Sequence, residues 1–259
     1  MPHTLIVMPS IPVDVLREIL EHLRKADLTT LCRVNKICCS CAQDVLYREI
    51  EYEVEDVIHT LARSIDLARR VRSFHTSGDY PELATALRNM SSLRRLGYDG
   101  FSDDASILDG CTFKLDSFKT TFPYSESLQN FLNSQSSLTK FTIYDGVVRH
   151  PPPFKETFLP NLTRVRAAPC WVHMLIPGRP VRDVEVFEPG EKEDPIDFSI
   201  FTFSTAPIRK LQISYHALYP TPGSRLASIF PSLEHLAIET RKMNCAVRIP
   251  HYICRFNRC

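Results

Sequence analysis

Cysteine is the residue whose clustering in this chain could do chemistry, because thiolates bind zinc and react with oxidants. Four of the nine cysteines, Cys32, Cys38, Cys39 and Cys41, lie close together. Structural zinc sites use two short pairs of ligands separated by a loop, whereas this cluster lies in a helical pattern that points its side chains in different directions. The spacing therefore predicts free thiols.

A second group of possible metal ligands lies near the C-terminus. It comprises Cys245, His251, Cys254 and Cys259. Their separations match no known arrangement of zinc ligands, so we expect no metal here either. An odd number of cysteines also argues against a disulfide framework and for a reducing compartment.

Sequence signatures of catalysis are absent. The eight glycines form neither a G-x-G-x-x-G pattern nor a phosphate-binding loop, and neither G-x-S-x-G nor H-E-x-x-H occurs. The nine histidines are scattered singly along the chain. We therefore predict a protein that is not an enzyme and has no cofactor.

The charge balance limits the partners. The chain has 31 basic and 30 acidic side chains, a net charge of +1, which argues against nucleic-acid or membrane-surface binding through clustered cations. No apolar run approaches the roughly 18 residues of a membrane-spanning helix. The N-terminus lacks a basic first segment and contains Pro9 and Pro12, unlike a secretory signal. We expect an intracellular protein, cytoplasmic or nuclear.

Residues 14–47 have the pattern of three short helices. Asp14 is the expected N-cap of the first, whose apolar residues share one face. These are Val15, Leu16, Ile19, Leu20 and Leu23. Asp27 is the expected N-cap of the second helix, and the third is expected from Ala42 to Tyr47.

From about residue 47 the chain repeats a six-residue motif: apolar, polar, polar, apolar, any, apolar or small. The eight instances begin at Val71, Leu93, Leu115, Leu138, Leu162, Val181, Ile208 and Leu233. Their starts are 19 to 27 residues apart, and a ninth instance, Tyr47–Tyr52, would begin the sheet. Leucine-rich repeats have this period, with one short strand per repeat.

The segments between the motifs carry helical patterns or loops. Residues 81–90, 125–133 and 224–230 are expected to be helical and to form the convex side of a solenoid. The prolines at 151–153 and the acidic stretch 188–195 are expected loops. Residues 241–259 show no periodicity, so we expect either a frayed final repeat or a chain that continues.

The predicted fold is therefore α/β, a small helical head followed by a leucine-rich-repeat solenoid with a curved parallel sheet. The expected boundaries are a flexible N-terminus at 1–8, the head at 9–50, the solenoid at 51–240 and an irregular tail at 241–259. In the solenoid, the motif positions before and after the second apolar residue point outward. The cations at these positions form an expected substrate-binding ridge: Arg95, Lys119, Lys140, Arg164, Arg166 and Lys210.

The head resembles an F-box. The resemblance rests on Ile11-Pro12-Val-Asp-Val-Leu16-Arg-Glu-Ile19-Leu20-Glu-His-Leu23, followed by Ala26-Asp27-Leu28, Val34 and Leu46-Tyr47, in a form similar to fungal F-box proteins. Asn35, Cys38 and Tyr47 depart from the residues that are frequent in the family. With repeats following directly, the resemblance implies a substrate-recognition subunit of an SCF-type cullin-RING ubiquitin ligase.

The resemblance also implies the partners. The F-box would dock a Skp-type adaptor, and the repeats would hold a protein substrate that the sequence does not identify. A head of about forty residues cannot bury all its apolar side chains, and those left over mark an interface. The expected adaptor-binding residues are Ile11, Pro12, Val15, Leu16, Ile19, Leu20, Leu28, Leu31, Val34, Leu46 and Tyr47. The alternative is a repeat scaffold whose helical head only caps the solenoid.

Overall fold

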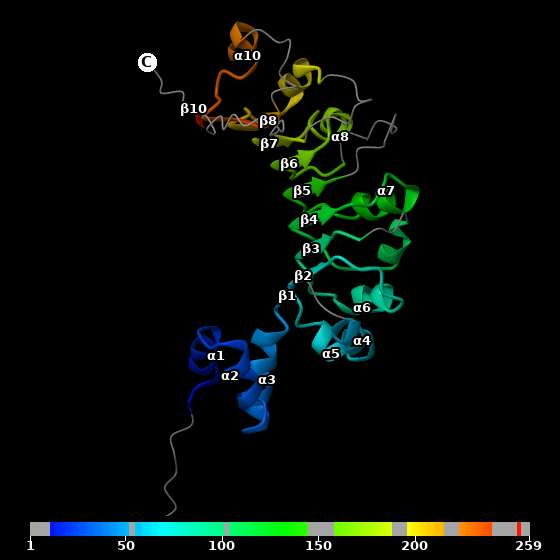
Figure 1. The fold of residues 1–259 in the computed structure, drawn as a ribbon, viewed down its shortest axis with the longest axis vertical. Coiled ribbons are helices and arrows are strands. Elements are labelled where there is room, and N and C mark those ends of the chain that lie inside the picture. The colour runs from blue at the N-terminus through cyan, green and yellow to red at the C-terminus, as the bar shows by residue number, and fades with distance from the viewer. Residues whose placement is uncertain are drawn as a thin grey trace, which may run out of the picture.

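The computed structural model describes residues 11–51, 55–100, 104–144, 158–187, 196–214, 223–239 and 253–254. A helical head lies at one end of a long sheet, and the strands follow one another along the molecule (Figure 1). The expected loops at 151–153 and 188–195 lie outside the described residues.

The head consists of α1 (Val13–Glu21), α2 (Lys25–Leu31) and α3 (Lys36–Leu46). The two predicted N-caps are wrong, because α1 is preceded by Pro12 and α2 by Arg24, which place Asp14 and Asp27 in the first turns. Carboxylates there still favour the positive helix N-terminus. The third helix begins earlier than predicted, because the Asn35 side chain accepts a hydrogen bond from the Cys38 amide at 2.8 Å.

The core of the head is small. Its fully buried members are Leu20, Leu28, Cys41 and Ala42. Partly buried side chains, among them Leu16, Leu31 and Leu46, pack against them. So few buried residues supply little of the burial that offsets the entropy of ordering the chain, and the head depends on further contacts.

Nine parallel strands form an open sheet in chain order. They are β1 (Glu49–Glu51), β2 (Ser73–Thr76), β3 (Arg95–Tyr98), β4 (Ser117–Thr120), β5 (Lys140–Ile143), β6 (Arg164–Ala167), β7 (Asp183–Val186), β8 (Lys210–Ser214) and β9 (His235–Glu239). β10 (Ile253–Cys254) pairs antiparallel with β9. The tail expected to be irregular therefore contains two sheet residues.

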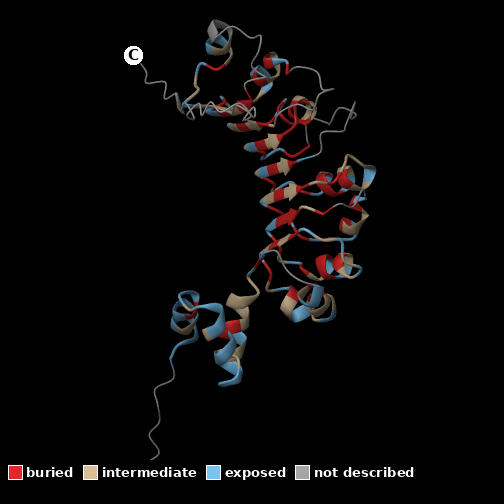
Figure 2. Ribbon diagram, viewed as in Figure 1, coloured by how far each residue is buried: buried red, intermediate tan, exposed pale blue. Residues whose placement is uncertain are grey.

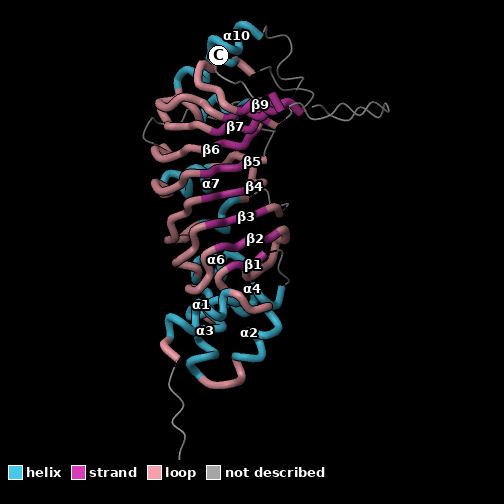
Figure 3. The backbone as a smooth tube through the Cα atoms, turned by 90° about the vertical axis from the view of Figure 1, so that its left-hand side faces the viewer, coloured by secondary structure: helices cyan, strands magenta, loops and turns pink. Residues whose placement is uncertain are grey.

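The predicted motif sets the register of the sheet. Its second apolar residue aligns from strand to strand, as in Phe74 with Leu96 and Phe118 with Phe141. The residue at the first polar position of each motif adds two further backbone hydrogen bonds, because its carbonyl accepts two amides of the next repeat. The Arg72 carbonyl accepts the amides of Arg94 and Arg95 at 2.9 and 3.0 Å. The same double contact recurs from Arg48 through to Arg209, and each strand is thereby stacked on its predecessor (Figure 3).

Helices cover one side of the sheet. In chain order the covering elements are α4 (Glu55–Arg63), α5 (Ile65–Ala68), α6 (Leu83–Asn89), η1 (Ala105–Leu108), α7 (Glu126–Asn133), α8 (Pro169–Leu175), η2 (Phe198–Phe203) and α10 (Gly223–Ile229). The three helices expected from the sequence correspond to α6, α7 and α10. One continuous core lies between the sheet and this layer (Figure 2).

Aromatic rings fill the middle of this core. Phe118 is fully buried, and its ring lies 5.5 Å from that of Phe131 in α7 and 5.7 Å from that of Phe141 in β5. The contact with Phe131 is edge-to-face and the contact with Phe141 is stacked, and both kinds add to the free energy gained by burial. Phe118 therefore ties two repeats and the covering layer together.

We predict that Phe118→Ala destabilises the fold by about 3–5 kcal/mol, because it leaves a cavity where three rings meet. Phe203→Ala is the matched control, since Phe203 is 61% exposed. Urea unfolding followed by circular dichroism measures both. Equal losses for the two variants would contradict the core position of Phe118.

Candidate functional site

Exposed apolar side chains concentrate in the head. Of the nine large hydrophobic residues that are exposed in the described part of the chain, six lie between residues 11 and 37. They are Ile11, Val13, Val15, Ile19, Val34 and Ile37. An exposed apolar surface of this density on a small unit is typical of a protein interface.

The helical spacing of α1 explains how this surface arises. Leu16 and Leu20 lie one turn apart and face the core of the head. Val15 and Ile19, also one turn apart, lie beside that stripe and are 46% and 47% exposed. The apolar face of α1 is therefore wider than the core that it covers, and its edge faces solvent.

The structure divides the expected adaptor-binding residues by burial. Ile11, Pro12, Val15, Ile19 and Val34 are exposed. Leu16, Leu31, Leu46 and Tyr47 are partly buried, whereas Leu20 and Leu28 lie in the core of the head. These last two hold the helices together and present no surface to a partner.

Two exposed apolar residues were missed by the sequence prediction. Val13 lies before the N-cap predicted at Asp14, and Ile37 lies before the third helix as predicted from Ala42. The signal for both was present: Pro12 favours a helix start at Val13, and Asn35 is a good N-cap for a helix that contains Ile37.

The exposed face of the sheet carries the predicted cationic residues. On β4, β5 and β6 the positions on either side of the second apolar residue are exposed or half-buried, as the alternation of a strand requires. Most of these cations are paired. Arg95 pairs with Glu49, Lys119 with Asp99 at 2.7 Å, Arg164 with Asp183 at 2.7 Å and Arg166 with Glu185 at 2.6 Å.

This pairing changes the expected electrostatics of the ridge. Lys140 and Lys210 make no ion pair with any described residue. Asp183 and Glu185, which lie on the same face, neutralise the cations beside them. The positive charge is therefore reduced mainly to two separated lysines.

An aromatic pair that the sequence did not predict lies among these cations. Tyr144 follows β5 and Phe187 follows β7, and their rings stack with centroids 4.8 Å apart. The Arg166 guanidinium lies 5.1 Å from the Phe187 ring, and the Lys119 ammonium lies 5.3 Å from the Tyr144 ring. Both aromatics come one residue after a repeat motif, which is why the motif did not reveal them.

A hydrogen-bonded carboxylate, that of Asp99, lies on the β4 side of this cluster. Burial alone raises the pKa of Asp99, but hydrogen bonds from Lys119 and His75 outweigh it and hold the pKa below the usual value of 3.8. The ionised carboxylate fixes Lys119 and His75 on the outer face. A group with a lowered folded-state pKa stabilises the fold above its unfolded pKa and loses that effect as the pH falls.

The described cysteines are not arranged for chemistry. Cys32, Cys38, Cys39, Cys41, Cys111 and Cys170 are free thiols. Burial raises the pKa of Cys111 to about 12, and burial followed by the nearby Cys39 raises the pKa of Cys32. Within the described ranges no three His, Cys, Asp or Glu side chains are placed to hold a metal. Cys245, His251 and Cys259 lie outside those ranges, so the absence of a metal stays a prediction.

Comparison of the chain with known protein families identifies a domain in the head. Residues 8–49 match the F-box domain, which confirms the resemblance deduced from the three helices. A search of curated proteins finds no match to this chain. Within the described residues, no helix is long and apolar enough to cross a membrane.

These findings define a class of protein. The chain carries an F-box domain joined to a C-terminal α/β region with a parallel sheet. F-box domains generally bind Skp-type adaptors in cullin-RING ligases, and proteins that carry them are typically adaptors without enzymatic activity. An SCF substrate-recognition subunit is the general role that the domain suggests.

We predict that Asp99→Asn lowers the urea midpoint at pH 7, because it removes the charge that holds Lys119 and His75. The difference from the unchanged protein should shrink as the pH falls below about 3.8, where the carboxyl group of the unfolded chain becomes protonated. Asp116→Asn is the control, since Asp116 is 54% exposed and lies 3.7 Å from Arg94. A difference between wild type and Asp99→Asn that does not depend on pH would refute the charge-based explanation.

Proposed function

We propose that this chain is a substrate-recognition subunit of an SCF-type cullin-RING ubiquitin ligase, in which the head docks a Skp-type adaptor and the outer face of the sheet binds a protein substrate. The observation that carries the proposal is the exposed apolar surface of the head, formed within the F-box match. The contact residues are Ile11, Pro12, Val15, Ile19 and Val34, with Val13 and Ile37 added from the structure.

The C-terminal region acts as a leucine-rich-repeat-like solenoid in this proposal. One strand per repeat, a period of about 23 residues and alignment of equivalent positions support that assignment. Stacked repeats of this kind present a continuous strand face. Substrate contact falls on Arg95, Lys119, Lys140, Arg164, Arg166 and Lys210, with the Tyr144 and Phe187 rings as an aromatic anchor.

The physical work of such a subunit is positioning. Ubiquitin transfer takes place on other subunits, so this chain contributes by holding a substrate near them. Two groups held together react as if at very high local concentration, which needs no catalytic side chain in the holding subunit.

The alternative is a repeat scaffold whose head is only a cap. A cap turns its apolar residues toward the first repeat and presents a polar outer face. Here the first strand, β1, follows α3 directly, as a cap would allow. The exposed Val15 and Ile19 on α1, however, favour an outside partner over capping.

The adaptor contact can be tested with charged substitutions at exposed positions. Val15→Asp combined with Ile19→Asp should reduce capture of a purified Skp-type adaptor at least about tenfold, because two apolar contacts are replaced by desolvated charges. Ile65→Asp is the matched control, since Ile65 is 50% exposed but lies in α5, outside the F-box match. Undiminished capture by a folded double variant would leave the scaffold alternative standing.

The substrate face can be tested at Lys140 and Lys210, the cations of the ridge that make no ion pair with a described residue. Lys140→Glu combined with Lys210→Glu should deplete acidic or phosphatase-sensitive proteins from the purified complex while the adaptor is retained, because these charges lie where such a segment would bind. Lys114→Glu with Arg182→Glu makes the same change in charge at exposed positions off the strands. An identical set of partners from both variants and the unchanged protein would remove Lys140 and Lys210 from the binding surface.

A further inference from the structure

Arginines gather where the head meets the first repeat. A cavity of about 610 Å³ is lined by Arg17, Ser40, Asp44, Arg48, Asp66, Arg69, Arg70 and Arg72. The lining thus contains five guanidinium groups and two carboxylates, a formal charge of +3 at neutral pH. The cavity is separate from the apolar surface of the head and from the outer face of the sheet, and neither of the functions above uses it.

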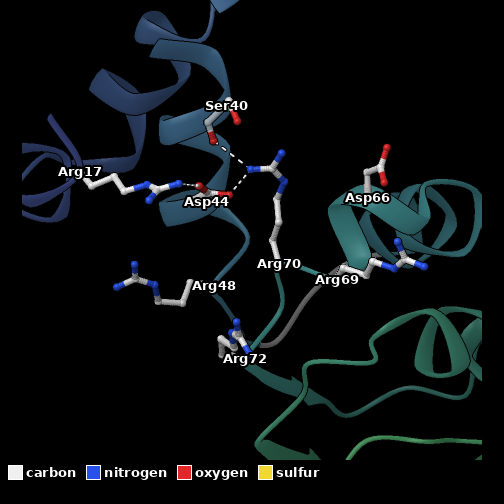
Figure 4. A pocket seen from close by; sticks show the side chains of 8 residues that line it. All are labelled: Arg17, Ser40, Asp44, Arg48, Asp66, Arg69, Arg70 and Arg72. Carbon is white, nitrogen blue, oxygen red and sulfur yellow. Dashed lines mark hydrogen bonds and ion pairs between the residues drawn. The ribbon is translucent and has the colours of Figure 1, made fainter. Parts of the chain in front are cut away.

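The two carboxylates do not neutralise this cavity. Asp44 is shared, since Arg17 lies 3.3 Å from its Oδ2 atom and Arg70 bonds its Oδ1 atom (Figure 4). Asp66 is exposed and makes no ion pair with a described residue. Arg48 is paired with Glu21 at 2.6 Å. Arg69 and Arg72 have no carboxylate partner in the ranges that the structure describes.

Arg70 is held in place but not satisfied. It extends from the segment after α5 toward α3, where its Nη1 atom also donates to the Ser40 carbonyl at 2.9 Å (Figure 4). Its Nε atom is buried and lacks a hydrogen-bond partner among the described residues. A buried donor without a partner is costly, so the position of Arg70 is maintained at a cost in free energy.

We propose that this cavity binds a compact soluble polyanion that carries two or more phosphate groups. Arginine forks donate paired, charge-assisted hydrogen bonds to phosphate oxygens, and several arginines are needed to balance several phosphates. The volume lies in the range of small-molecule sites. In this proposal the ligand contacts Arg70 and Arg72. The exposed side chain of Arg69 changes its orientation to contact the ligand as well.

The bound polyanion would join the head to the first repeat. Arg17, Ser40 and Asp44 belong to the head, whereas Arg69, Arg70 and Arg72 precede β2. A ligand held from both sides adds contacts across the junction and stabilises the folded chain. This inference does not rest on the ligase function, because it concerns residues outside both proposed binding surfaces.

Isothermal titration of the full chain with sodium tripolyphosphate tests the proposal. We expect saturable binding of one tripolyphosphate per chain, weakened by added salt and at least about tenfold weaker for inorganic monophosphate, which makes fewer of these contacts. Arg69→Gln combined with Arg72→Gln should weaken binding of tripolyphosphate about tenfold or more, since each lost charge-assisted contact is substantial. Circular dichroism confirms that the variant is folded.

Arg33→Gln combined with Arg182→Gln is the matched control. Both residues are exposed and lie outside the cavity, and the two substitutions remove the same amount of charge. Unchanged affinity in this control is the expected result. The absence of saturable binding, or an equal loss in the control, would overturn the site. A phosphoserine peptide that binds more tightly than tripolyphosphate and displaces it would also overturn the proposal, since it would make a protein-borne phosphate the ligand.

Discussion

The fold depends on one repeated backbone contact. At each repeat, the carbonyl of the first polar motif position accepts two amides from the next repeat, as Asp116 does from Thr139 and Lys140 at 3.0 and 3.1 Å. This contact leaves no freedom of register between neighbouring strands. A slip of one residue would turn every apolar position outward, so the ladder and the hydrophobic core reinforce each other. The motif is visible in the sequence because both requirements act on the same six residues.

The same stacking determines the electrostatics of the outer face. Equivalent positions lie one strand apart, about 4.8 Å, so a charged residue has its nearest neighbours at the same position of the adjacent repeats. Arg164 therefore meets Asp183, and Arg166 meets Glu185, as direct cross-strand pairs. Exposed pairs contribute little to stability, and their main effect is to cancel the field of the ridge. The neighbours of Lys140 in the sheet register are Ser117 and Arg164. Neither is acidic, so they do not cancel the positive charge of Lys140.

The accuracy of the sequence predictions follows from the range of the interactions involved. The head and the strand period could be predicted, since helical spacing and repeat spacing are local and redundant. The predicted helix starts were wrong. The first two helices begin after Pro12 and Arg24 and not at the predicted N-caps Asp14 and Asp27, and the third begins after Asn35 and not at Ala42. Ion pairs such as Lys119 with Asp99 could not be predicted, because they join residues of different repeats. Arg69 and Arg70 lie outside the repeat motif, and only the fold brings them and Arg72 beside Ser40 and Asp44 of α3.

The junction decides whether the two ends of the molecule act together. A stacked sheet transmits orientation from one repeat to the next, but the head has only four fully buried core residues and contacts the rest through α3, β1 and a few polar groups. Asp44 carries much of that contact by holding Arg17 of α1 and Arg70 of the first repeat at once. Arg69 and Arg72 have no carboxylate partner among the described residues, so this network carries more positive than negative charge. A polyanion bound there, as proposed above, would add contacts to both the head and the first repeat, and it would so bear on the angle between the head and the sheet.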